Sequence, residues 1–291
     1  MRVKKSKGNK FGFIPTLAVI IIFVISGIYS EISKKDFQPL DNNLNIYCLD
    51  VGQGDCTYIV FPDGKTMLID AGEKEESAYI KLKKYVDEKI DYFVITHPHS
   101  DHAGGAEEVI DNYKTDKIFM PDASNTLKFF ENLIDKISEE NIPLVTAKTG
   151  VIIHEGENLK AEIISPRESG YNDLNNMSAV VKITYGDNTF LFMGDAEKEV
   201  EDDITSDVNS DFIRVGHHGS KTSSTNSFLK RVNPQYAVIS VGEFNDYNHP
   251  DEKVLKRFEK LGTKVYRTDQ AGDIFVTSDG KIIEILCEKE F

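Results

Sequence analysis

Ten consecutive residues, 96–105, place four potential metal ligands within six positions of one another. The segment reads Thr-His-Pro-His-Ser-Asp-His-Ala-Gly-Gly, and its ligands are His97, His99, Asp101 and His102. The apolar run 92–95 precedes it and predicts a buried strand, whereas a glycine pair and a helical pattern follow it. The sequence therefore predicts a corner between a strand and a helix, with the ligands at the end of the strand.

The spacing of these ligands suits two cations. His97 and His99 are two residues apart in extended backbone, so their side chains point the same way and can share one cation. Asp101 and His102 come just after the bend and can reach a second cation beside the first. A polar loop that contains histidine by chance is the alternative. Three of the chain's seven histidines lie within these six positions, which favours the metal site.

The rest of the chain predicts two strand-rich halves, each covered by helices. Helical patterns separate short alternating strands at residues 75–88, 106–113, 125–140, 197–204, 224–231 and 252–261. Hairpins are predicted at residues 151–164, with a turn at 154–157, and at 179–192. This plan predicts an α/β fold, an αββα sandwich. Each candidate ligand then falls at the end of a strand, along one edge of the sandwich.

Further segments accompany the ligand motif. They are residues 50–55 (Asp-Val-Gly-Gln-Gly-Asp), 68–72 (Leu-Ile-Asp-Ala-Gly), 192–195 (Phe-Met-Gly-Asp) and 215–220 (Val-Gly-His-His-Gly-Ser). Their order, together with the His-x-His-x-Asp-His motif, resembles the metallo-β-lactamase superfamily. The tail segments 248–250, 265–269 and 272–274 resemble one branch in particular, the C-terminal hydrolase domain of ComEC-type DNA-uptake proteins and its stand-alone relatives. The likeness covers about residues 44–286.

The resemblance implies the remainder of a two-metal centre. Asp195, at the end of a predicted strand, would bridge the two cations, and His217 would complete the second metal site, with His218 as the neighbouring alternative. Asp70 would orient a ligand histidine rather than bind metal. The expected cofactors are two divalent metal ions, zinc or manganese.

The first metal site departs from the superfamily's usual pattern. A separate histidine normally lies between the first motif and the bridging aspartate, but the only histidine in that interval is His154, which we predict to be exposed in a hairpin turn. In the ComEC-like branch, residues 175–178 (Asn-Asn-Met-Ser) take that place. Asn176 and Ser178 are candidate substrate ligands, and the spacing leaves open which of Asn175, Asn176 and Ser178 points inward. Such oxygens suit a harder cation or a substrate phosphate, so manganese is as credible as zinc.

A second polar run could bind a phosphoryl group. Residues 220–224 (Ser-Lys-Thr-Ser-Ser) offer hydroxyl groups, a cation and backbone N–H groups at a predicted helix start. Ser220, Lys221 and Ser223 are its candidate substrate ligands, and an ordinary helix cap is the compatible alternative. The candidate catalytic residues are Asp101, His218 and His249, of which the two histidines could protonate a leaving group.

The N-terminal segment predicts a membrane anchor. Residues 1–10 carry five Lys or Arg and no acid, and residues 11–30 carry no charge. Twenty helical residues span about 30 Å, roughly one bilayer core, and the basic flank predicts a cytoplasmic N-terminus. We expect a basic tail at 1–10, a single-pass signal anchor at 11–30, a tether at 31–43 and an extracytoplasmic hydrolase domain at 44–291. A signal peptide cleaved near Ser30, which would leave a secreted protein, is the alternative.

The leading hypothesis is a membrane-anchored phosphodiesterase that uses a hydroxide activated by two metals. Its substrate would be single-stranded DNA or a phosphorylated surface polymer. The net charge of −14 disfavours strong nonspecific binding to nucleic acid, because such binding depends on Lys and Arg neutralising phosphates, but it does not exclude cleavage of a phosphodiester held by the metals. The alternatives are a lactone, thioester or β-lactam hydrolase of the same superfamily, and a non-catalytic binding module. The sequence indicates no protein partner.

Overall fold

The computed structural model describes residues 37–74, 78–167 and 170–290. Contacts divide the chain into residues 1–38 and a larger compact unit, 39–291. The predicted basic tail and the predicted anchor at 11–30 lie outside the described residues. Within the described part of the chain, no helix is long and apolar enough to cross a membrane.

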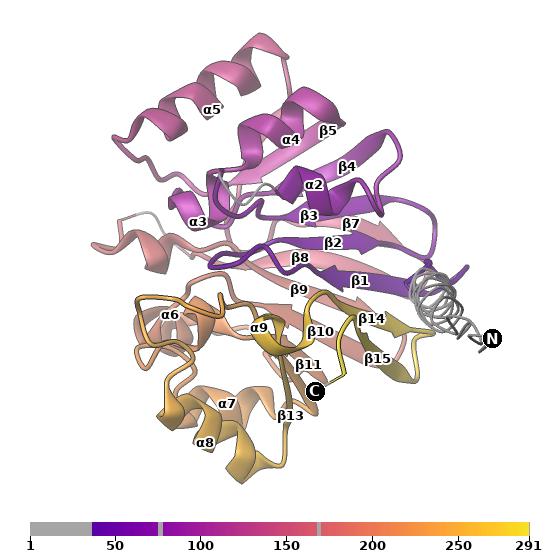
Figure 1. Cartoon of the computed structure of the whole chain (residues 1–291), viewed down its shortest axis with the longest axis vertical. Helices are drawn as coiled ribbons and strands as arrows, with labels where there is room; N and C mark the ends of the chain where they lie inside the picture. The colour runs from indigo at the N-terminus through magenta and orange to yellow at the C-terminus, as the bar shows by residue number, and fades with distance from the viewer. Residues whose placement is uncertain (1–36, 75–77, 168–169, 291) are drawn as a thin grey trace, which may run out of the picture. The chain divides into compact units, whose positions relative to one another are not determined.

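Two β-sheets form the centre of the larger unit (Figure 1). The eight-stranded sheet has the order β15-β14-β1-β2-β3-β4-β5-β6, and the seven-stranded sheet has the order β13-β12-β11-β10-β9-β8-β7. The strands of the first sheet are β1 (Leu44–Cys48), β2 (Thr57–Val60), β3 (Thr66–Ile69), β4 (Lys89–Val94), β5 (Lys114–Met120), β6 (Leu144–Thr146), β14 (Ile274–Ser278) and β15 (Ile283–Cys287). Those of the second are β7 (Ile152–Gly156), β8 (Leu159–Ser165), β9 (Val180–Tyr185), β10 (Asn188–Phe192), β11 (Phe212–Arg214), β12 (Tyr236–Ile239) and β13 (Lys264–Arg267).

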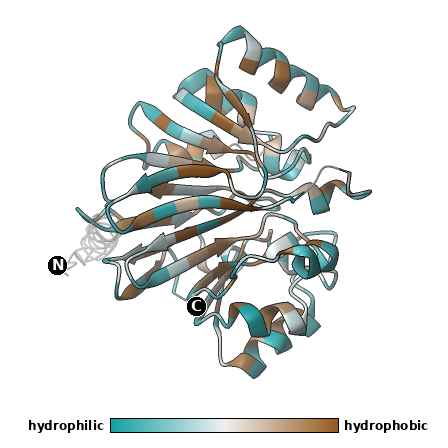
Figure 2. Ribbon diagram, turned by 180° about the vertical axis from the view of Figure 1, so that it is seen from behind, coloured by the Kyte–Doolittle hydropathy of each residue, from teal (hydrophilic) through white to brown (hydrophobic). Residues whose placement is uncertain are grey.

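The main core lies between the two sheets. Apolar side chains such as Ile46 and Ile59 from one sheet and Ile183 and Phe190 from the other belong to one buried cluster. Hydrophobic segments accordingly run along the strands, whereas hydrophilic residues are frequent on the helices (Figure 2). Burial of this apolar surface is the main force that holds the sheets face to face.

Helices cover the outer side of each sheet. On the seven-stranded sheet, α6 (Lys198–Asp203), α7 (Asn226–Val232) and α8 (Glu252–Leu261) supply residues to a second buried cluster with strands β9 to β12. On the eight-stranded sheet lie α2 (Ala78–Leu82), α4 (Ala106–Asn112) and α5 (Lys128–Glu139) (Figure 1). The short elements are α3 (Ser100–Ala103), α9 (Thr268–Ala271) and the 3₁₀ helices η1 (Leu174–Met177) and η2 (Gly216–Gly219). The predicted α/β sandwich of two sheets is confirmed.

Local sequence explains the ends of the longer helices. Helix α8 begins after Asp251, whose side chain accepts a hydrogen bond from the backbone N–H of Lys253, and it ends at Gly262, whose φ of 74° suits a residue without a Cβ. Its buried residues Val254 and Phe258 are four positions apart and therefore share one face. The helix thus packs its apolar face on the sheet.

Two predicted elements differ from the structure. The helix predicted at 75–88 is helical only at Ala78–Leu82 within the described residues, and Tyr85 beyond it packs on Tyr47, with ring centroids 4.5 Å apart. The hairpin turn predicted at 154–157 lies instead at residues 157–158, between β7 and β8. His154 is therefore on a strand.

Candidate metal centre

The parallel strands of both sheets bring the predicted ligands to one edge. Strands β3 to β6 are parallel to one another, and so are β10 to β13. Residues 97–102 follow β4, Asp195 follows β10, and η2 with His217 and His218 follows β11. Because the carboxyl ends of parallel strands face the same way, these segments converge at one end of the sandwich.

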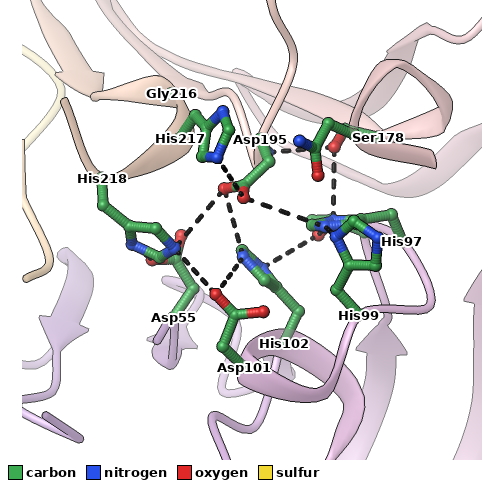
Figure 3. A network of polar contacts seen from close by, with 12 residues as sticks. Asp55, His97, His99, Asp101, His102, Ser178, Asp195, Gly216, His217 and His218 are labelled. Atoms are coloured by element: carbon green, nitrogen blue, oxygen red, sulfur yellow. Dashed lines mark hydrogen bonds and ion pairs between the residues drawn. The ribbon is translucent and has the colours of Figure 1, made fainter. Parts of the chain in front are cut away.

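Asp195 lies at the centre of the converging side chains (Figure 3). Four imidazoles direct Nε2 toward its carboxylate. The distances are 3.1 Å from His102 and 3.8 Å from His218 to Oδ1, and 3.7 Å from His217 and 3.9 Å from His97 to Oδ2. The carboxylate is 3% exposed, so it is held among these rings with almost no access to water.

Four of these residues form a compact group. One ligand atom from each of Asp101, His102, Asp195 and His218 lies within 4.8 Å of the other three. His102 Nε2 and Asp195 Oδ1 are buried 3.1 Å apart, and neither makes a hydrogen bond of suitable geometry with any described residue. Buried polar atoms are rarely left without a partner. Two imidazole nitrogens and two carboxylates are a donor set that zinc and manganese both accept, so the residues fit a divalent cation.

The other ring nitrogen of each imidazole is already engaged. His102 Nδ1 lies 2.7 Å from Asp70 Oδ2, His218 Nδ1 lies 3.0 Å from the Ser240 carbonyl oxygen, and His217 Nδ1 lies 3.0 Å from Glu197 Oε1. A ring nitrogen that donates to an oxygen leaves the other nitrogen with its lone pair free to bind metal. Asp70 therefore lies where it can orient the His102 ring.

Consecutive residues with positive φ place the last two histidines. His217 has φ 50° and ψ 48°, and His218 has φ 50° and ψ 25°. Non-glycine residues rarely adopt this left-handed conformation, and such residues are concentrated at functional sites. His218, which the sequence offered as the alternative to His217, is the one that joins Asp101 and His102 in the compact group.

Asp55 and Arg214 support this group and were not assigned to it from the sequence. Asp55 Oδ1 lies 3.3 Å from His218 Nδ1 and 2.5 Å from Arg214 Nη2. Burial alone would raise the pKa of Asp55, but the Arg214 guanidinium and His218 outweigh it and lower that pKa. Burial likewise opposes protonation of His218, but Asp195, Asp101 and Asp55 together raise its pKa to about 10. The cluster therefore favours a positive charge at its centre.

The segment at 175–178 was predicted to point one residue toward the site, and the structure turns Asn176 and Ser178 toward neighbouring backbone N–H groups. Ser178 Oγ accepts a hydrogen bond from the Asp195 backbone N–H at 3.0 Å, and Asn176 Oδ1 accepts one from the Glu197 backbone N–H at 3.1 Å. The Asn176 amide also donates to Glu199 at 3.0 Å. Both side chains are therefore engaged in contacts within the protein. Asn175 is the residue of this segment that lines the central cleft, and its buried Oδ1 has no partner within the described chain.

The polar run at 220–224, which was predicted to bind a phosphoryl group, makes several hydrogen bonds within the protein. Ser223 is fully buried, and its hydroxyl donates to the Gly216 carbonyl oxygen at 2.7 Å. Ser220 Oγ lies 2.8 Å from Thr222 Oγ1. Helix α7 begins only at Asn226, and the Glu201 carboxylate already accepts the backbone N–H groups of Ser224 and Thr225. Lys221 is exposed and is not among the residues that line the cleft.

The cleft beside Asp195 has a volume of about 290 Å³. Besides ligand candidates, including His99, its lining includes Asn175, Tyr247 and His249. Burial, together with the neighbouring His217 and His218, lowers the pKa of His249 to about 4. His249 is therefore neutral at pH 7, which argues against its predicted role as a protonated acid, although it does face the cleft.

His154 is remote from these contacts. It stands on β7, and its Nε2 lies 2.8 Å from Asp63 Oδ2 while its ring packs on Phe61 at 4.9 Å between centroids. The imidazole is only 10% exposed, so the prediction of an exposed histidine is wrong. The apolar ring of Phe61 and the carboxylate of Asp63 account for its burial.

A family model described as the metallo-beta-lactamase superfamily matches residues 49–243. The match covers more than half of the chain and contains the ligand motif, Asp195, His217 and His218. The chain belongs to the metallo-beta-lactamase superfamily. The predicted membership is thereby confirmed, and the protein has the metal-hydrolase fold of that superfamily.

Relatives within the superfamily confirm the predicted branch. The chain is 29% identical to ComE operon protein 3 of Bacillus subtilis (strain 168) over 78% of its own length and 32% of the relative. It is 30% identical to Recombination protein 2 of Haemophilus influenzae over 89% of its length and 31% of the relative, and 27% identical to Competence protein ComA of Neisseria gonorrhoeae over 80% and 32%. These are ComEC-type competence proteins. The chain spans about a third of the length of each.

Two solved structures resemble this chain in fold. CmlA, a diiron beta-hydroxylase from Streptomyces venezuelae, aligns with a TM-score of 0.52 and 12% identity over 79% of this chain and 53% of its own. Igni18, a metallo hydrolase from Ignicoccus hospitalis KIN4/I, aligns with a TM-score of 0.50 and 17% identity over 80% and 98%. At such low identity the likeness concerns the fold alone.

Proposed function

We propose that this protein is a phosphodiesterase that requires two divalent cations, zinc or manganese. The observation that carries the proposal is the buried Asp195 carboxylate, toward which four imidazoles direct Nε2 at 3.1 to 3.9 Å. Asp101, His102 and His218 would hold one cation against Oδ1, and His97 and His99 would hold the other against Oδ2. Asp195 would then bridge the two.

The cations, when bound, would supply Lewis acidity that activates a water molecule and polarises a phosphoryl oxygen. The chain's own residues fix the geometry for this chemistry. Asp70 and the Ser240 carbonyl oxygen each hold an Nδ1–H, so His102 and His218 present Nε2 to the centre. Ser178 accepts a hydrogen bond from the Asp195 backbone, which would keep the bridging carboxylate between the histidines of the two sites. Asn175 and His249 face the cleft and can donate hydrogen bonds to a substrate's oxygens.

A nucleic-acid phosphodiester is the substrate that the relatives' names favour, because they refer to competence and recombination. The cleft adds an argument from chemistry. Tyr247 lines it and is 67% exposed, and its ring stacks on His249 with centroids 5.8 Å apart and planes 24° apart. An exposed aromatic ring beside a catalytic centre suits stacking of a base from a single strand. A phosphorylated surface polymer has no such planar group.

We also propose that residues 11–30 anchor the protein in the cell membrane, with the catalytic domain outside. This rests on the uncharged stretch and its basic flank. Protease treatment of intact cells would test it, because an external domain is degraded while cytoplasmic markers survive. Survival of the domain until the cells are lysed would contradict the proposed orientation.

The activity can be tested on the full-length protein purified in detergent without chelator. We would assay bis-p-nitrophenyl phosphate and labelled single-stranded DNA with added zinc or manganese, beside Asp195→Asn and, as a matched control, Asp187→Asn in the exposed β9–β10 turn. We expect both substrates to be cleaved by the wild type and the control, with activity reduced on the order of a thousandfold in Asp195→Asn, equivalent to about 4 kcal/mol.

The other outcomes separate the competing functions. Cleavage of the small ester alone would favour a surface polymer as substrate. Two bound cations without hydrolysis of either phosphodiester would sink the proposal and direct the search to lactones, thioesters and β-lactams. Fewer than one cation per chain would favour a binding module.

A further inference from the structure

The side of the centre around His97 and His99 lacks the third histidine that the superfamily usually supplies. His97 Nε2 and His99 Nδ1 lie 3.0 Å apart, close enough to share one cation. The only histidine in the expected interval, His154, is held on β7 by Asp63 and Phe61. Two imidazoles and one carboxylate oxygen would leave a loosely held ion, so a further donor on this side would matter.

His217 approaches this side from the second sheet. Its Nε2 lies 3.7 Å from Asp195 Oδ2, the oxygen that is also 3.9 Å from His97 Nε2. His218 approaches the other oxygen, Oδ1, at 3.8 Å (Figure 3). His217 and His218 therefore approach different oxygens of the Asp195 carboxylate. Both residues have a left-handed backbone with φ 50°, and their rings lie 6.2 Å apart between centroids with planes 70° apart.

The neighbours of His217 hold it in this position. Glu197 Oε1 lies 3.0 Å from His217 Nδ1, so the ring donates there and leaves Nε2 free. Asn176 Oδ1 in turn accepts the Glu197 backbone N–H at 3.1 Å. The segment that replaces the usual histidine thus does not supply the missing ligand at Asn176. Instead, Asn176 holds the backbone of Glu197, whose carboxylate accepts a hydrogen bond from His217.

We propose that His217 is the third imidazole ligand of the first metal site, together with His97, His99 and Asp195 Oδ2. Glu197 is its positioning residue. The inference rests on the proposed two-metal function and reverses the sequence-based assignment of His217 to the second site. It makes the first site as rich in donors as the second, although it draws them from the two different sheets.

Metal content per chain tests the assignment without reference to activity. Full-length protein in detergent would be stripped, reloaded with Mn²⁺ or Zn²⁺, freed of loose ions by gel filtration and measured by elemental analysis. We expect two ions in the wild type and one in each of His217→Ala, His99→Ala and Asp101→Ala. Circular dichroism would establish that each variant is folded, and the exposed-turn variant Asp187→Asn would serve as the matched control.

Double variants decide which site His217 belongs to. Substituting two residues of the same site should lose no more ions than substituting one of them. Substituting residues of different sites should lose the ions of both sites. We expect His217→Ala with His99→Ala to keep about one ion, and His217→Ala with Asp101→Ala to keep none. The reverse pattern would place His217 in the second site, and two tightly held ions in His217→Ala would show that it is no ligand. Either result overturns the inference.

Two further outcomes separate this inference from the proposed function. A wild type that binds only one ion overturns both. Two ions with the expected additivity but no phosphodiester hydrolysis would remove the proposed function and leave the ligand assignment standing.

The positioning role of Glu197 has its own readout. We expect Glu197→Ala to weaken the first ion's affinity roughly 10- to 100-fold in a chelator competition, because the ring loses its acceptor. Glu197→Gln keeps an oxygen at the same distance and should recover most of that loss. Equal affinities in the two variants would contradict a positioning role.

Discussion

Arg214 Nη2 lies 2.5 Å from Asp55 Oδ1, and both side chains are buried beneath the candidate metal centre. The pair joins the two sheets, since Asp55 precedes β2 and Arg214 ends β11. The same carboxylate oxygen lies 3.3 Å from His218 Nδ1. The negative charge of Asp55, which lies beside His218, is therefore balanced by the buried guanidinium of Arg214 from the other sheet.

Replacing Arg214 by methionine should destabilise the protein strongly. The change leaves the Asp55 carboxylate buried without its cation, and breaking a buried ion pair from one side costs about 3–5 kcal/mol in the free energy of unfolding. Urea denaturation followed by circular dichroism would measure it. The double variant Arg214→Met with Asp55→Leu removes both charges and should regain most of the loss. A double variant less stable than the single one would contradict this account.

Metal binding should raise the melting temperature of chelator-treated protein. A ligand that binds only the folded state, present at 100 times its Kd, stabilises it by about 2.7 kcal/mol, which corresponds to roughly 5–10 °C for a domain of this size. In Asp195→Asn the bridging carboxylate is gone, so most of the shift should vanish, whereas Asp187→Asn should behave as the wild type. Differential scanning fluorimetry with Zn²⁺ or Mn²⁺ would measure the shift. An equal shift in Asp195→Asn would argue against a bridging role.

The positions of the candidate ligands at strand ends were predictable from the sequence because each depends on local pattern. His97, His99, Asp101 and His102 follow an apolar run that had to be a buried strand, and Asp195 ends a hairpin strand. Their chemistry and their place at the edge of the sheets follow from those two facts. The same reasoning located Asp70, since it too ends a strand.

The different positions of His217 and His218 around Asp195 were not predictable, because both residues have a left-handed backbone. No hydrophobic periodicity encodes such a conformation. The contacts of the polar run at 220–224 were not predictable either, because the helix begins two residues after it and because Glu201, distant in sequence, accepts the N–H groups of Ser224 and Thr225. Arg214 did give one signal, a charged residue inside an apolar strand, but only the fold shows that its partner is Asp55.

Asp91 should stabilise the fold at neutral pH and cease to do so in acid. Burial alone would raise its pKa, but hydrogen bonds from Lys89, Lys65 and Thr66 lower it from 3.8 to about 2. Because the folded-state pKa lies below the unfolded one, the stabilisation is complete above about pH 4 and is lost as the pH falls toward 2. A shift of this size corresponds to about 2 kcal/mol.

The variant Asp91→Asn tests this dependence. Urea denaturation at pH 7 should show it to be about 2 kcal/mol less stable than the wild type, and the difference should shrink steadily as the pH falls below 4. Asp187→Asn in the exposed turn should show no comparable difference. A gap between wild type and Asp91→Asn that stays constant from pH 7 to pH 3 would assign the loss to packing rather than to charge.

Tyr247 should discriminate between substrates with and without bases. Its ring is 67% exposed at the cleft, whereas Phe244, 89% exposed on the same loop, is not among the residues that line it. The loop is braced by Asn245, whose amide donates to the carbonyl oxygens of Gly242 and His249 at 2.9 and 2.8 Å. A braced loop holds the ring in place before the substrate arrives, which reduces the entropy lost on binding.

Stacking of one base on an aromatic ring contributes about 1–3 kcal/mol. Tyr247→Ala should therefore weaken binding of a short single-stranded oligonucleotide roughly 10- to 100-fold, while Tyr247→Phe, which keeps the ring, and Phe244→Ala should bind nearly as the wild type does. Fluorescence anisotropy would measure these affinities, with an abasic oligonucleotide of equal length as the comparison. If Tyr247→Ala weakens the abasic strand as much as the natural one, the ring contacts the backbone and the cleft does not select for bases.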